Sequence, residues 1–455
     1  MKIPISIILI TQVVIVSKLL GTTSLSKMSD VQEKKPFIYI ENEPVLEIHE
    51  GYVSQKKETV LVKQRTKTVA KVHLFEPVIV AQAEDEMPWG YFQFPKIYRG
   101  EKGNLIVAWS MQQDSHKTYG KGRPTQLMSK DEGLTWEPLK DDYVFTDRYG
   151  VELNDSEVLQ VKIPVSKDIR VYRHFPAPVS CRSIKGYKFY HENELPDELR
   201  GVYFKLWDKR ERKAIELHGN LNDSTLLRYA IDDLMPIVWW GDIKNLGNKK
   251  LVAGVYGGFY QGSDGNVLRS TVSFYKSIDD GRNWNLLSVI PFTNGEYKQN
   301  VIFDGYEGFN EPAFEVLNDG TYICIMRSGA VNPMYLTKSK DCGLHWSIPK
   351  PLAPNGVFPS ILKLDNGCLV LASGRPGVQL RFNIDGSGEK WTDPIDMVYY
   401  MNRGSYDIYA SCGYSCLLGV DRNTFYIVYS DFKKKNHEGI TRKAIMFRKV
   451  ELIVK

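Results

Sequence analysis

Three octapeptides of this chain follow one template, Ser-x-Asp-x-Gly-x-x-Trp: Ser129–Trp136 (SKDEGLTW), Ser277–Trp284 (SIDDGRNW) and Ser339–Trp346 (SKDCGLHW). In such a template the Asp side chain can bond its own backbone two residues on, the Gly can adopt a positive φ, and the Ser hydroxyl supports the turn. The Trp begins the next strand and covers the turn with a large apolar ring. One copy is typical of a β-hairpin, whereas three copies indicate a repeated β-unit that decides the fold.

A second repeat runs out of phase with these boxes and consists of an apolar strand, an Asn/Asp-Gly turn or a near equivalent, and another apolar strand. Its clear copies begin at Phe94–Pro95, Glu311–Pro312 and Phe358–Pro359, and weaker copies lie near Pro236 and Tyr414. Each unit therefore holds two hairpins, and four strands are the content of one propeller blade. We expect an all-β fold, a six-bladed β-propeller of four-stranded antiparallel blades, with five or seven blades as alternatives.

The first residues are typical of a signal peptide, because Lys2 is followed by the apolar run Ile3–Val16. Lys18 ends this run, so the run is too short to span a bilayer comfortably. We therefore assign residues 1–26 to a signal peptide, predict a secreted or periplasmic protein, and expect no stable membrane association after cleavage. An uncleaved signal anchor is the alternative.

The rest of the chain divides into two further parts. Residues 27–70 are polar and rich in Lys and Glu, and we expect a leader or peripheral segment there, followed by a catalytic propeller over residues 71–455. A degenerate box stands at Asn383–Trp391, but none is clear between about 140 and 235, where we expect degenerate blades and insertions. Within that stretch, Asp208–His218 is expected to form a charged strand pair or an insertion rather than a helix.

Charge and cysteine content exclude several functional classes. The net charge is only +5 over 455 residues, and Lys and Arg are scattered, so no nucleic-acid surface is indicated. The six Cys residues are neither dense nor arranged as Cys-x-x-Cys, so we predict no metal site, and no cofactor is indicated. Cys412 and Cys416 lie four residues apart on an expected strand, roughly 13 Å at about 3.3 Å per residue, so we do not expect them to bond to each other.

The boxes and the second repeat together resemble the sialidase (neuraminidase) superfamily of Asp-box propellers, over residues 88–137 and 235–432. In that family the first blade carries a Phe-Arg-Ile-Pro motif whose Arg binds the substrate carboxylate, and this chain has Gln93 at the position of that Arg. The family then places an acid/base Asp in the loop before the first box, and Asp114 occupies that loop. The resemblance therefore implies substrate binding by Gln93 and acid/base catalysis by Asp114.

The other family positions follow in the same order. A Glu that begins a strand corresponds to Glu311, and an Arg about one hairpin later corresponds to Arg327. A third Arg in a later blade corresponds to Arg375 in Gly-Arg-Pro-Gly, and a Tyr in a Tyr-Ser-x-Leu context corresponds to Tyr414. The resemblance implies that Glu311 and Tyr414 are catalytic and that the two arginines bind substrate.

The mechanism that this resemblance implies is chemically coherent. Sialic acid carries a carboxylate on its anomeric carbon, which would repel an anionic nucleophile. A neutral Tyr414 whose proton passes to Glu311 avoids this repulsion and gives a retaining mechanism. Asp114 would protonate the leaving oxygen and then activate water. Guanidinium groups would clamp the substrate carboxylate through paired hydrogen bonds. The implied activity is that of an exported exo-glycosidase acting on a glycan or polysaccharide that contains an acidic sugar.

Gln93 is the main departure from the family pattern, because it brings no charge to the clamp. Loss of a charge-assisted hydrogen bond costs roughly 1.5–3 kcal/mol. Either another cation substitutes, with Lys96, Arg99 and Arg403 as candidates, or the substrate is not sialic acid.

Two more residues are candidates for substrate binding. Trp240 lies on an expected inner hairpin and offers an aromatic face that suits a sugar ring. His116 shares the loop of Asp114 and competes with it for the same position. Two rival functions stay open: a propeller polysaccharide lyase or uronate-active hydrolase that uses His116, Tyr119 and Arg327, and a non-catalytic glycan-binding propeller.

Overall fold

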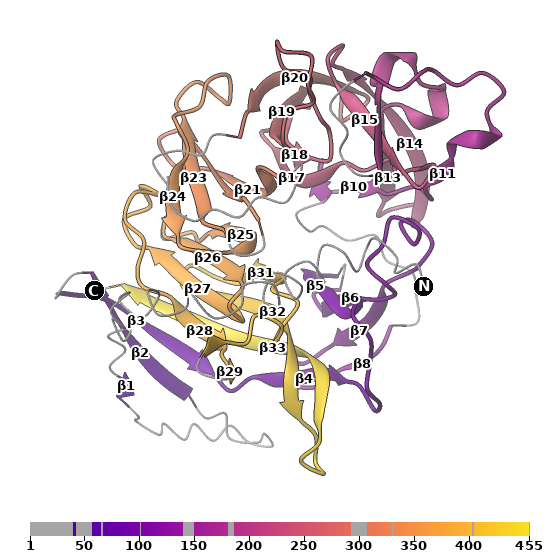
Figure 1. Cartoon of the computed structure of the whole chain (residues 1–455). Coiled ribbons are helices and arrows are strands. Elements are labelled where there is room, and N and C mark those ends of the chain that lie inside the picture. The colour runs from indigo at the N-terminus through magenta and orange to yellow at the C-terminus, as the bar shows by residue number, and fades with distance from the viewer. Residues whose placement is uncertain are drawn as a thin grey trace, which may run out of the picture.

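The structure is a computed structural model that describes residues 40–41, 57–64, 67–100, 102–139, 150–180, 186–292, 307–329, 332–402 and 405–454. The expected signal peptide at residues 1–26 lies outside these residues. The described part has several four-stranded antiparallel sheets arranged around the centre of the molecule (Figure 1), which confirms the predicted all-β fold and its four-stranded antiparallel units. Short 3₁₀ helices occur at Ile169–Val171, Glu192–Glu194 and Asp197–Leu199. No helix in the described ranges is long and apolar enough to cross a membrane.

Three sheets have the simple order of four consecutive antiparallel strands. The first contains β5 (Tyr91–Arg99), β6 (Leu105–Met111), β7 (Thr125–Ser129) and β8 (Glu137–Pro138). The second contains β21 (Asn310–Val316), β22 (Tyr322–Arg327), β23 (Met334–Ser339) and β24 (Lys350–Ala353). The third contains β25 (Val357–Lys363), β26 (Leu369–Gly374), β27 (Val378–Asn383) and β28 (Ile395–Val398).

An eight-stranded sheet joins two further groups of four strands. One group contains β9 (Gly150–Glu152), β10 (Glu157–Lys162), β13 (Val202–Asp208) and β14 (Lys213–Asn222). The other contains β17 (Trp240–Asn245), β18 (Leu251–Tyr256), β19 (Val272–Ser277) and β20 (Asn283–Ile290). The two groups meet through a parallel pairing of β14 with β20. The prediction of a strand pair at Asp208–His218 is confirmed, because this stretch holds the end of β13 and most of β14.

A separate small sheet contains the expected insertion between the β10 and β17 regions. Its strands are β12 (Tyr187–His191), β15 (Leu227–Ile231), β16 (Leu234–Met235) and β11 (Lys167–Asp168). It is held to its surroundings by Arg228, which is fully buried and bonds Glu192 at 2.5 Å and the carbonyl of Gly201 at 2.7 Å. A buried charge of this kind is tolerated because its partners replace its lost hydration.

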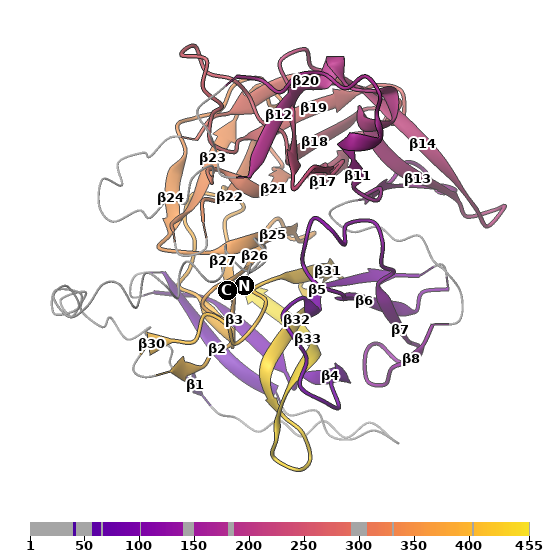
Figure 2. The same ribbon diagram turned by 45° about the vertical axis from the view of Figure 1, so that its right-hand side comes forward.

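The last sheet combines the two ends of the described chain. It contains β1 (Ile40–Glu41), β2 (Lys57–Gln64), β3 (Lys67–Phe75), β33 (Thr441–Val454), β32 (Thr424–Lys435) and β31 (Ser415–Gly419), while β4 (Val78–Gln82) also pairs with β33. A separate two-stranded pair, β29 (Met401–Asn402) and β30 (Ser405–Tyr406), comes before β31 in the chain. Figure 2 shows β2 and β3 beside β33, and the expected domain boundary at residue 71 falls within β3.

The Ser-x-Asp-x-Gly-x-x-Trp boxes form the turns between the third and fourth strands of their sheets, away from β5 and β21 at the opposite edges. In the second box, Ser277 Oγ accepts the N–H of Gly281 at 3.0 Å, and Asp279 Oδ1 accepts the N–H of Asn283 at 2.9 Å. Trp284 Nε1 donates to the carbonyl of Gly281, whose φ is 86°. Asp279 therefore accepts the N–H four residues further along the chain. The N–H two residues after Asp279, which we expected the Asp to bind, is bound by Ser277 instead.

The core lies between neighbouring sheets. Phe274 of β19 packs against Phe314 of β21 with ring centroids 5.3 Å apart, and Phe382 of β27 packs against Phe425 of β32 at 6.3 Å. These contacts bind each sheet to the next and fix the ends of their strands. No disulfide joins the Cys residues that the structure describes, so Cys412 and Cys416 are not bonded to each other, as predicted.

Candidate active site

Three edge strands begin with the same backbone feature. Phe94, Glu311 and Phe358 each precede a Pro and have φ values of 55°, 47° and 46°. Non-Gly residues rarely adopt a positive φ, and the register with the neighbouring strand shifts at each of these positions. Bulges of this kind redirect side chains at the end of a strand. At the second of these positions the redirected side chain is the carboxylate of Glu311.

Glu311 is the acceptor at the centre of the site. Its Oε1 atom accepts hydrogen bonds from the Tyr414 hydroxyl and from Arg327 Nη1, the latter at 2.7 Å. Its Oε2 atom accepts the backbone N–H of Phe358 at 2.7 Å. The side chain is buried, with 3% of its surface exposed, and burial alone would raise its pKa. The charge of Arg327 and the bonds from Tyr414 and Phe358 outweigh the burial, so the pKa of Glu311 falls below its ordinary value of 4.5. Glu311 is therefore an ionised base.

Tyr414 and Asp114 are shifted in the opposite direction. Burial raises the pKa of the Tyr414 hydroxyl well above 10, and the negative charge of Glu311 raises it further, so the phenol is neutral. Enclosure by the protein also raises the pKa of Asp114 above its ordinary value of 3.8, and the charge of Glu311 adds to this effect. The Asp114 side chain is nonetheless exposed, because it lies in a concave wall whose surface is open to the cavity. The pKa of Asp114 and that of Glu311 are thus shifted in opposite directions, which favours the protonated form of the first and the ionised form of the second.

Two guanidinium groups lie beside this pair. Arg327 bonds Glu307 Oε1 at 3.2 Å in addition to Glu311, and the charges of both carboxylates outweigh burial and raise its pKa. Burial lowers the pKa of Arg375, and the like charge of Arg327 lowers it further. The Nε atoms of Arg327 and Arg375 have no hydrogen-bond partner in the described part of the chain. Two close cations with donors to spare form a receptor for an anion.

Gln93 and Asn310 occupy equivalent places in their sheets, each one residue before the positive-φ position. Gln93 pairs with Ser110 across β5 and β6, and Asn310 pairs with Arg327 across β21 and β22. Gln93 is only 1% exposed, and within the described ranges its Nε2 has no hydrogen-bond partner. The same holds for Asn310 Oδ1. Both side chains line one cavity and offer it an unmatched donor and acceptor.

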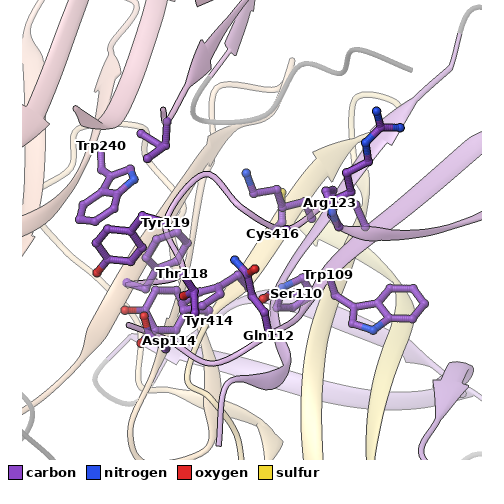
Figure 3. A pocket seen from close by; sticks show the side chains of 18 of the residues that line it. Trp109, Ser110, Gln112, Asp114, Thr118, Tyr119, Arg123, Trp240, Tyr414 and Cys416 are labelled. Carbon is purple, nitrogen blue, oxygen red and sulfur yellow. The ribbon is translucent and has the colours of Figure 1, made fainter. Parts of the chain in front are cut away.

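That cavity has a volume of about 290 Å³ and brings together the residues to which the sequence assigned catalysis or substrate binding, apart from the three candidates for a substitute cation. These residues are Gln93, Asp114, His116, Trp240, Glu311, Arg327, Arg375 and Tyr414. A larger cavity of about 460 Å³ adjoins it and shares Asp114, Tyr119, Trp240, Tyr256 and Tyr414 with it. Figure 3 shows Tyr119, Trp240, Tyr414 and Asp114 gathered at this junction.

Aromatic rings form one wall of the junction. The Trp240 ring lies edge to face with Tyr119 at 5.2 Å and tilted against Tyr256 at 5.5 Å. Such a wall presents an apolar face to a ligand.

His116 lies at the edge of the smaller cavity and faces acidic residues of the insertion. Its Nε2 is 3.7 Å from Asp232 Oδ2, which Lys117 Nζ approaches to 3.3 Å. Burial lowers the pKa of His116, so the imidazole is neutral near pH 7 although Asp232 opposes this shift. Its backbone carbonyl accepts a bond from Ser166 at 2.7 Å, which holds the loop.

The three candidates for a cation that substitutes for the Arg replaced by Gln93 lie in different places. Arg99 is not in the site, because it binds Glu132 of the first box at 2.9 and 3.1 Å and does not line either cavity. Lys96 lines the larger cavity but not the smaller one. Arg403 lies outside the described residues. In the part of the chain that the structure describes, Arg327 and Arg375 are the only Arg or Lys residues that line the smaller cavity.

Sequence reasoning did not indicate Glu307 or Asn310 as site residues. Asn310 had an available signal, because it stands in the second repeat where Gln93 stands in the first. Glu307 had none, since only the folded loop brings it to Arg327. Among the described residues, no group of three or more His, Cys, Asp or Glu side chains is placed to hold a metal ion.

Comparisons with known proteins place the fold but not an activity. No protein-family model and no curated protein matches the sequence. The chain is similar to a Dyadobacter fermentans protein of unknown function, with a TM-score of 0.55 and 15% identity over 84% of this chain and 99% of the other. It is also distantly similar to an α-L-arabinanase of Penicillium chrysogenum, with a TM-score of 0.42 and 17% identity over 82% and 98% of the chains. For the NanB sialidase of Streptococcus pneumoniae the TM-score is 0.43, with 12% identity over 82% and 70%.

Proposed function

We propose that this chain is an exported glycoside hydrolase that removes an acidic sugar from a glycan with retention of configuration, with Tyr414 as nucleophile. The proposal includes a six-bladed propeller, which six groups of antiparallel strands support: β5–β8, β9–β14 without the insertion, β17–β20, β21–β24, β25–β28, and β31–β33 with β4. It also includes export through residues 1–26 to a secreted or periplasmic location.

The hydrogen bond from Tyr414 to Glu311 carries this proposal. As the phenol oxygen attacks the anomeric carbon, its proton passes to Glu311 Oε1, which is ionised and placed to accept it. Asp114, whose raised pKa favours the protonated form, gives a proton to the leaving oxygen as the glycosidic bond breaks. The product of this step is a covalent intermediate in which the anomeric carbon is bonded to the phenol oxygen of Tyr414. Neither carboxylate is bonded to the sugar.

The second step reverses these roles. Asp114, now ionised, takes a proton from water as the water oxygen attacks the anomeric carbon. The bond to Tyr414 breaks, and Glu311 returns its proton to the phenolate. Each carboxyl group therefore recovers its starting state, and the sugar leaves with the configuration it had in the substrate.

The substrate carboxylate would lie against Arg327 and Arg375, with the Gln93 amide as a neutral third donor. The unmatched Nε2 of Gln93 supports this role, because a buried donor without a partner is satisfied only when a ligand arrives. A carboxylate held by two cations and one amide is bound less strongly than one held by three cations, which favours substrates that make further contacts elsewhere.

The test is a screen of aryl sialosides and aryl uronides, followed by the Tyr414→Phe variant on whichever class is hydrolysed. We expect Tyr414→Phe to lower kcat by a factor on the order of 10³ or more. Tyr429→Phe is the matched control, because Tyr429 is equally aromatic but buried in the core of β32, and it should keep full activity. Unchanged turnover by Tyr414→Phe would disprove the nucleophile.

A polysaccharide lyase is the second candidate, and one observation favours it: a neutral His116 lines the same cavity as the two arginines. A neutral imidazole can abstract the proton beside a uronate carboxylate that cations have neutralised. A lyase product absorbs ultraviolet light, whereas a hydrolase gives only new reducing ends. A protein that binds the glycan and yields neither product would be a non-catalytic glycan-binding propeller.

A further inference from the structure

The backbone that precedes Tyr414 departs from the sheet to which β31 and β32 belong. Residues 411–414, here called the Tyr414 segment, lie opposite only residues 430–431 of β32. Pairing is regular on either side: Ser415 begins the ladder of β31 with β32, and the carbonyl of Ala410 accepts a 2.7 Å bond from a backbone N–H of β32. Four residues therefore face two, and the backbone of the segment leaves the ladder. Its N–H groups need other acceptors, because they are buried beside the site.

Three consecutive N–H groups of the Tyr414 segment are bound by side chains. The N–H of Cys412 donates to Ser430 Oγ at 3.1 Å. The N–H of Gly413 donates to Ser411 Oγ at 3.0 Å, and the N–H of Tyr414 donates to the sulfur of Cys412 at 3.4 Å. The backbone in front of the proposed nucleophile thus depends on hydroxyl and thiol groups for its conformation.

Ser430 joins these acceptors into one network. Its hydroxyl donates to the sulfur of Cys412 at 2.9 Å, and its oxygen lies 3.1 Å from Ser411 Oγ. Since Ser430 has a single hydroxyl hydrogen, Ser411 is the donor in the second bond. Burial raises the pKa of the Cys412 thiol, so the sulfur accepts as a neutral group. The three side chains are at most 1% exposed. A buried group that loses its partner cannot turn to bulk water, so removing one member leaves its neighbours unsatisfied.

The position of the Tyr414 backbone determines whether the phenol reaches its acceptor. The hydroxyl donates to Glu311 Oε1. Glu311 is held from other directions by bonds from Arg327 Nη1 and from the N–H of Phe358, each at 2.7 Å. The acceptor is therefore fixed by its own partners, while the donor depends on the Tyr414 segment. Catalytic groups need to be held within about 0.5 Å of the productive geometry, so a small shift of this segment weakens the proton transfer to Glu311.

We propose that Ser430 and Cys412 are positioning residues, which act through the Tyr414 segment to hold the phenol of Tyr414 at Glu311. Neither of these two side chains lines the smaller or the larger cavity, so both act through the backbone and not on the substrate. This role rests on the proposed function, because it serves the attack by Tyr414.

The experiment compares Ser430→Ala, Cys412→Ala and Cys412→Ser on whichever aryl glycoside the wild type hydrolyses. Each Ala variant removes an acceptor from the network. We expect both to lower kcat about tenfold, as a lost contact of about 1.4 kcal/mol implies, and to change KM less than about threefold, because the arginines that bind substrate keep their own partners. Cys412→Ser keeps an acceptor for the N–H of Tyr414 and should restore most of kcat.

Cys412→Ser also keeps the proposal testable if an Ala variant does not fold. The oxygen of Ser stands on a shorter bond than the sulfur and reaches the N–H of Tyr414 less well, so kcat should still fall about threefold. A wild-type kcat in Cys412→Ser, or a kcat no higher than that of Cys412→Ala, overturns the proposal.

Ser339→Ala and Cys368→Ala are the matched controls. Ser339 is 1% exposed and accepts the N–H of Gly343 in the third box at 2.9 Å, and Cys368 is 2% exposed and donates to the carbonyl of Ile384 at 3.1 Å. Both variants should lower the melting temperature about as much as the network variants do, and both should keep the wild-type kcat. An equal loss of kcat in the controls means that only stability has changed, and it overturns the proposal. So does an unchanged kcat in Ser430→Ala.

A double-mutant cycle separates this proposal from the proposed function, because it needs no turnover. Tyr414→Phe removes the hydroxyl that Glu311 accepts, and denaturant unfolding measures its effect in wild type, in Ser430→Ala and in Cys412→Ser. We expect its effect on the unfolding equilibrium constant to be about tenfold smaller in Ser430→Ala than in wild type, and smaller also in Cys412→Ser. In Cys368→Ala it should equal the wild-type effect. If wild type hydrolyses no substrate, the proposed function fails. The positioning network then stands on this difference, and falls if Tyr414→Phe has the same effect in every background.

Discussion

Gln93 provides a sharp test of the site, because the same amide should weaken the free protein and strengthen the complex. Its side chain is 1% exposed and its Nε2 has no hydrogen-bond partner among the described residues. A buried donor without a partner costs about 1–3 kcal/mol, since it gives up water and gains nothing. Only the amide nitrogen is unmatched, so the lower end of this range applies. Gln93→Met, which keeps the length of the side chain and removes the amide, should raise the free energy of unfolding by about 1 kcal/mol.

The same substitution removes a donor from the proposed clamp. A neutral hydrogen bond contributes about 0.5–1.5 kcal/mol, so KM for the acidic-sugar substrate should rise about two- to tenfold. The value of kcat should change less, because Gln93 contacts neither Tyr414 nor Asp114 in any bond of the described structure. Stability and affinity are therefore expected to move in opposite directions.

Denaturant unfolding followed by Trp fluorescence measures the first effect, and initial rates on the active aryl glycoside measure the second. The melting temperature should rise by about 1 °C for a domain of this size. Gln379→Met is the matched control: Gln379 is buried too, but its Nε2 donates to Asp396 at 2.8 Å and its Oε1 accepts from Arg381 at 3.1 Å. That variant should lose about 1–3 kcal/mol, because it leaves both partners unpaired. If Gln93→Met destabilises the protein as much as the control does, or leaves KM unchanged, the reasoning is refuted.

Two further predictions concern pH and the boxes. The proposed mechanism needs Glu311 ionised and Asp114 protonated, and the pKa of Glu311 is lowered while that of Asp114 is raised. We therefore expect kcat/KM to fall with acid as Glu311 gains a proton and to fall with alkali as Asp114 loses one. A pH-rate profile in which Asp114→Asn still shows the alkaline fall would rule out Asp114 as the acid. Asp279 accepts bonds from Asn283 N, Asn283 Nδ2 and Ser277 Oγ at 2.9, 2.7 and 2.8 Å, so Asp279→Ala should cost about 1–3 kcal/mol of stability and leave kcat and KM as they are. Altered kinetics at full stability would contradict a purely structural role for the box.

Much of the fold was predictable because it depends on local turn chemistry. The boxes and the Asn/Asp-Gly turns each specify a hairpin within about ten residues of sequence, and their order determines which strands share a sheet. The strand pair at Asp208–His218 is also local, although its turn at residues 209–212 contains neither of these two signals. The parallel pairing of β14 with β20 is not local, because it joins Asn220–Asn222 to Asn283–Asn285 across distant sequence. No turn signal encodes such a contact.

The site divides in the same way. Asp114, Glu311, Arg327, Arg375 and Tyr414 could be located in sequence because the repeated turns set an order in which the resemblance to the sialidase superfamily implies each of them, and the structure brings all of them to one cavity. Their roles stay predictions. Partners on irregular loops were beyond sequence reasoning: Glu307 beside Arg327, and Asp232 beside His116. Arg99 shows the converse, because its sequence position fits the clamp while Glu132 holds it elsewhere.

The surroundings of Tyr414 explain how a repeated scaffold position can produce a chemical site. Phe94 and Phe358 occupy the same positive-φ position as Glu311 in their own sheets, and their rings lie 4.8 and 4.1 Å from the Tyr414 ring. One backbone feature used three times thus supplies two apolar walls and one carboxylate around a single phenol. The walls exclude water, which raises the pKa of Tyr414 and keeps it neutral. The third position then supplies the only acceptor that the phenol has in the described structure, and the backbone N–H of Phe358 holds that acceptor in place. In the proposed mechanism, a Glu at one of three equivalent positions, where the other two are Phe, supplies a base in place of an apolar packing contact.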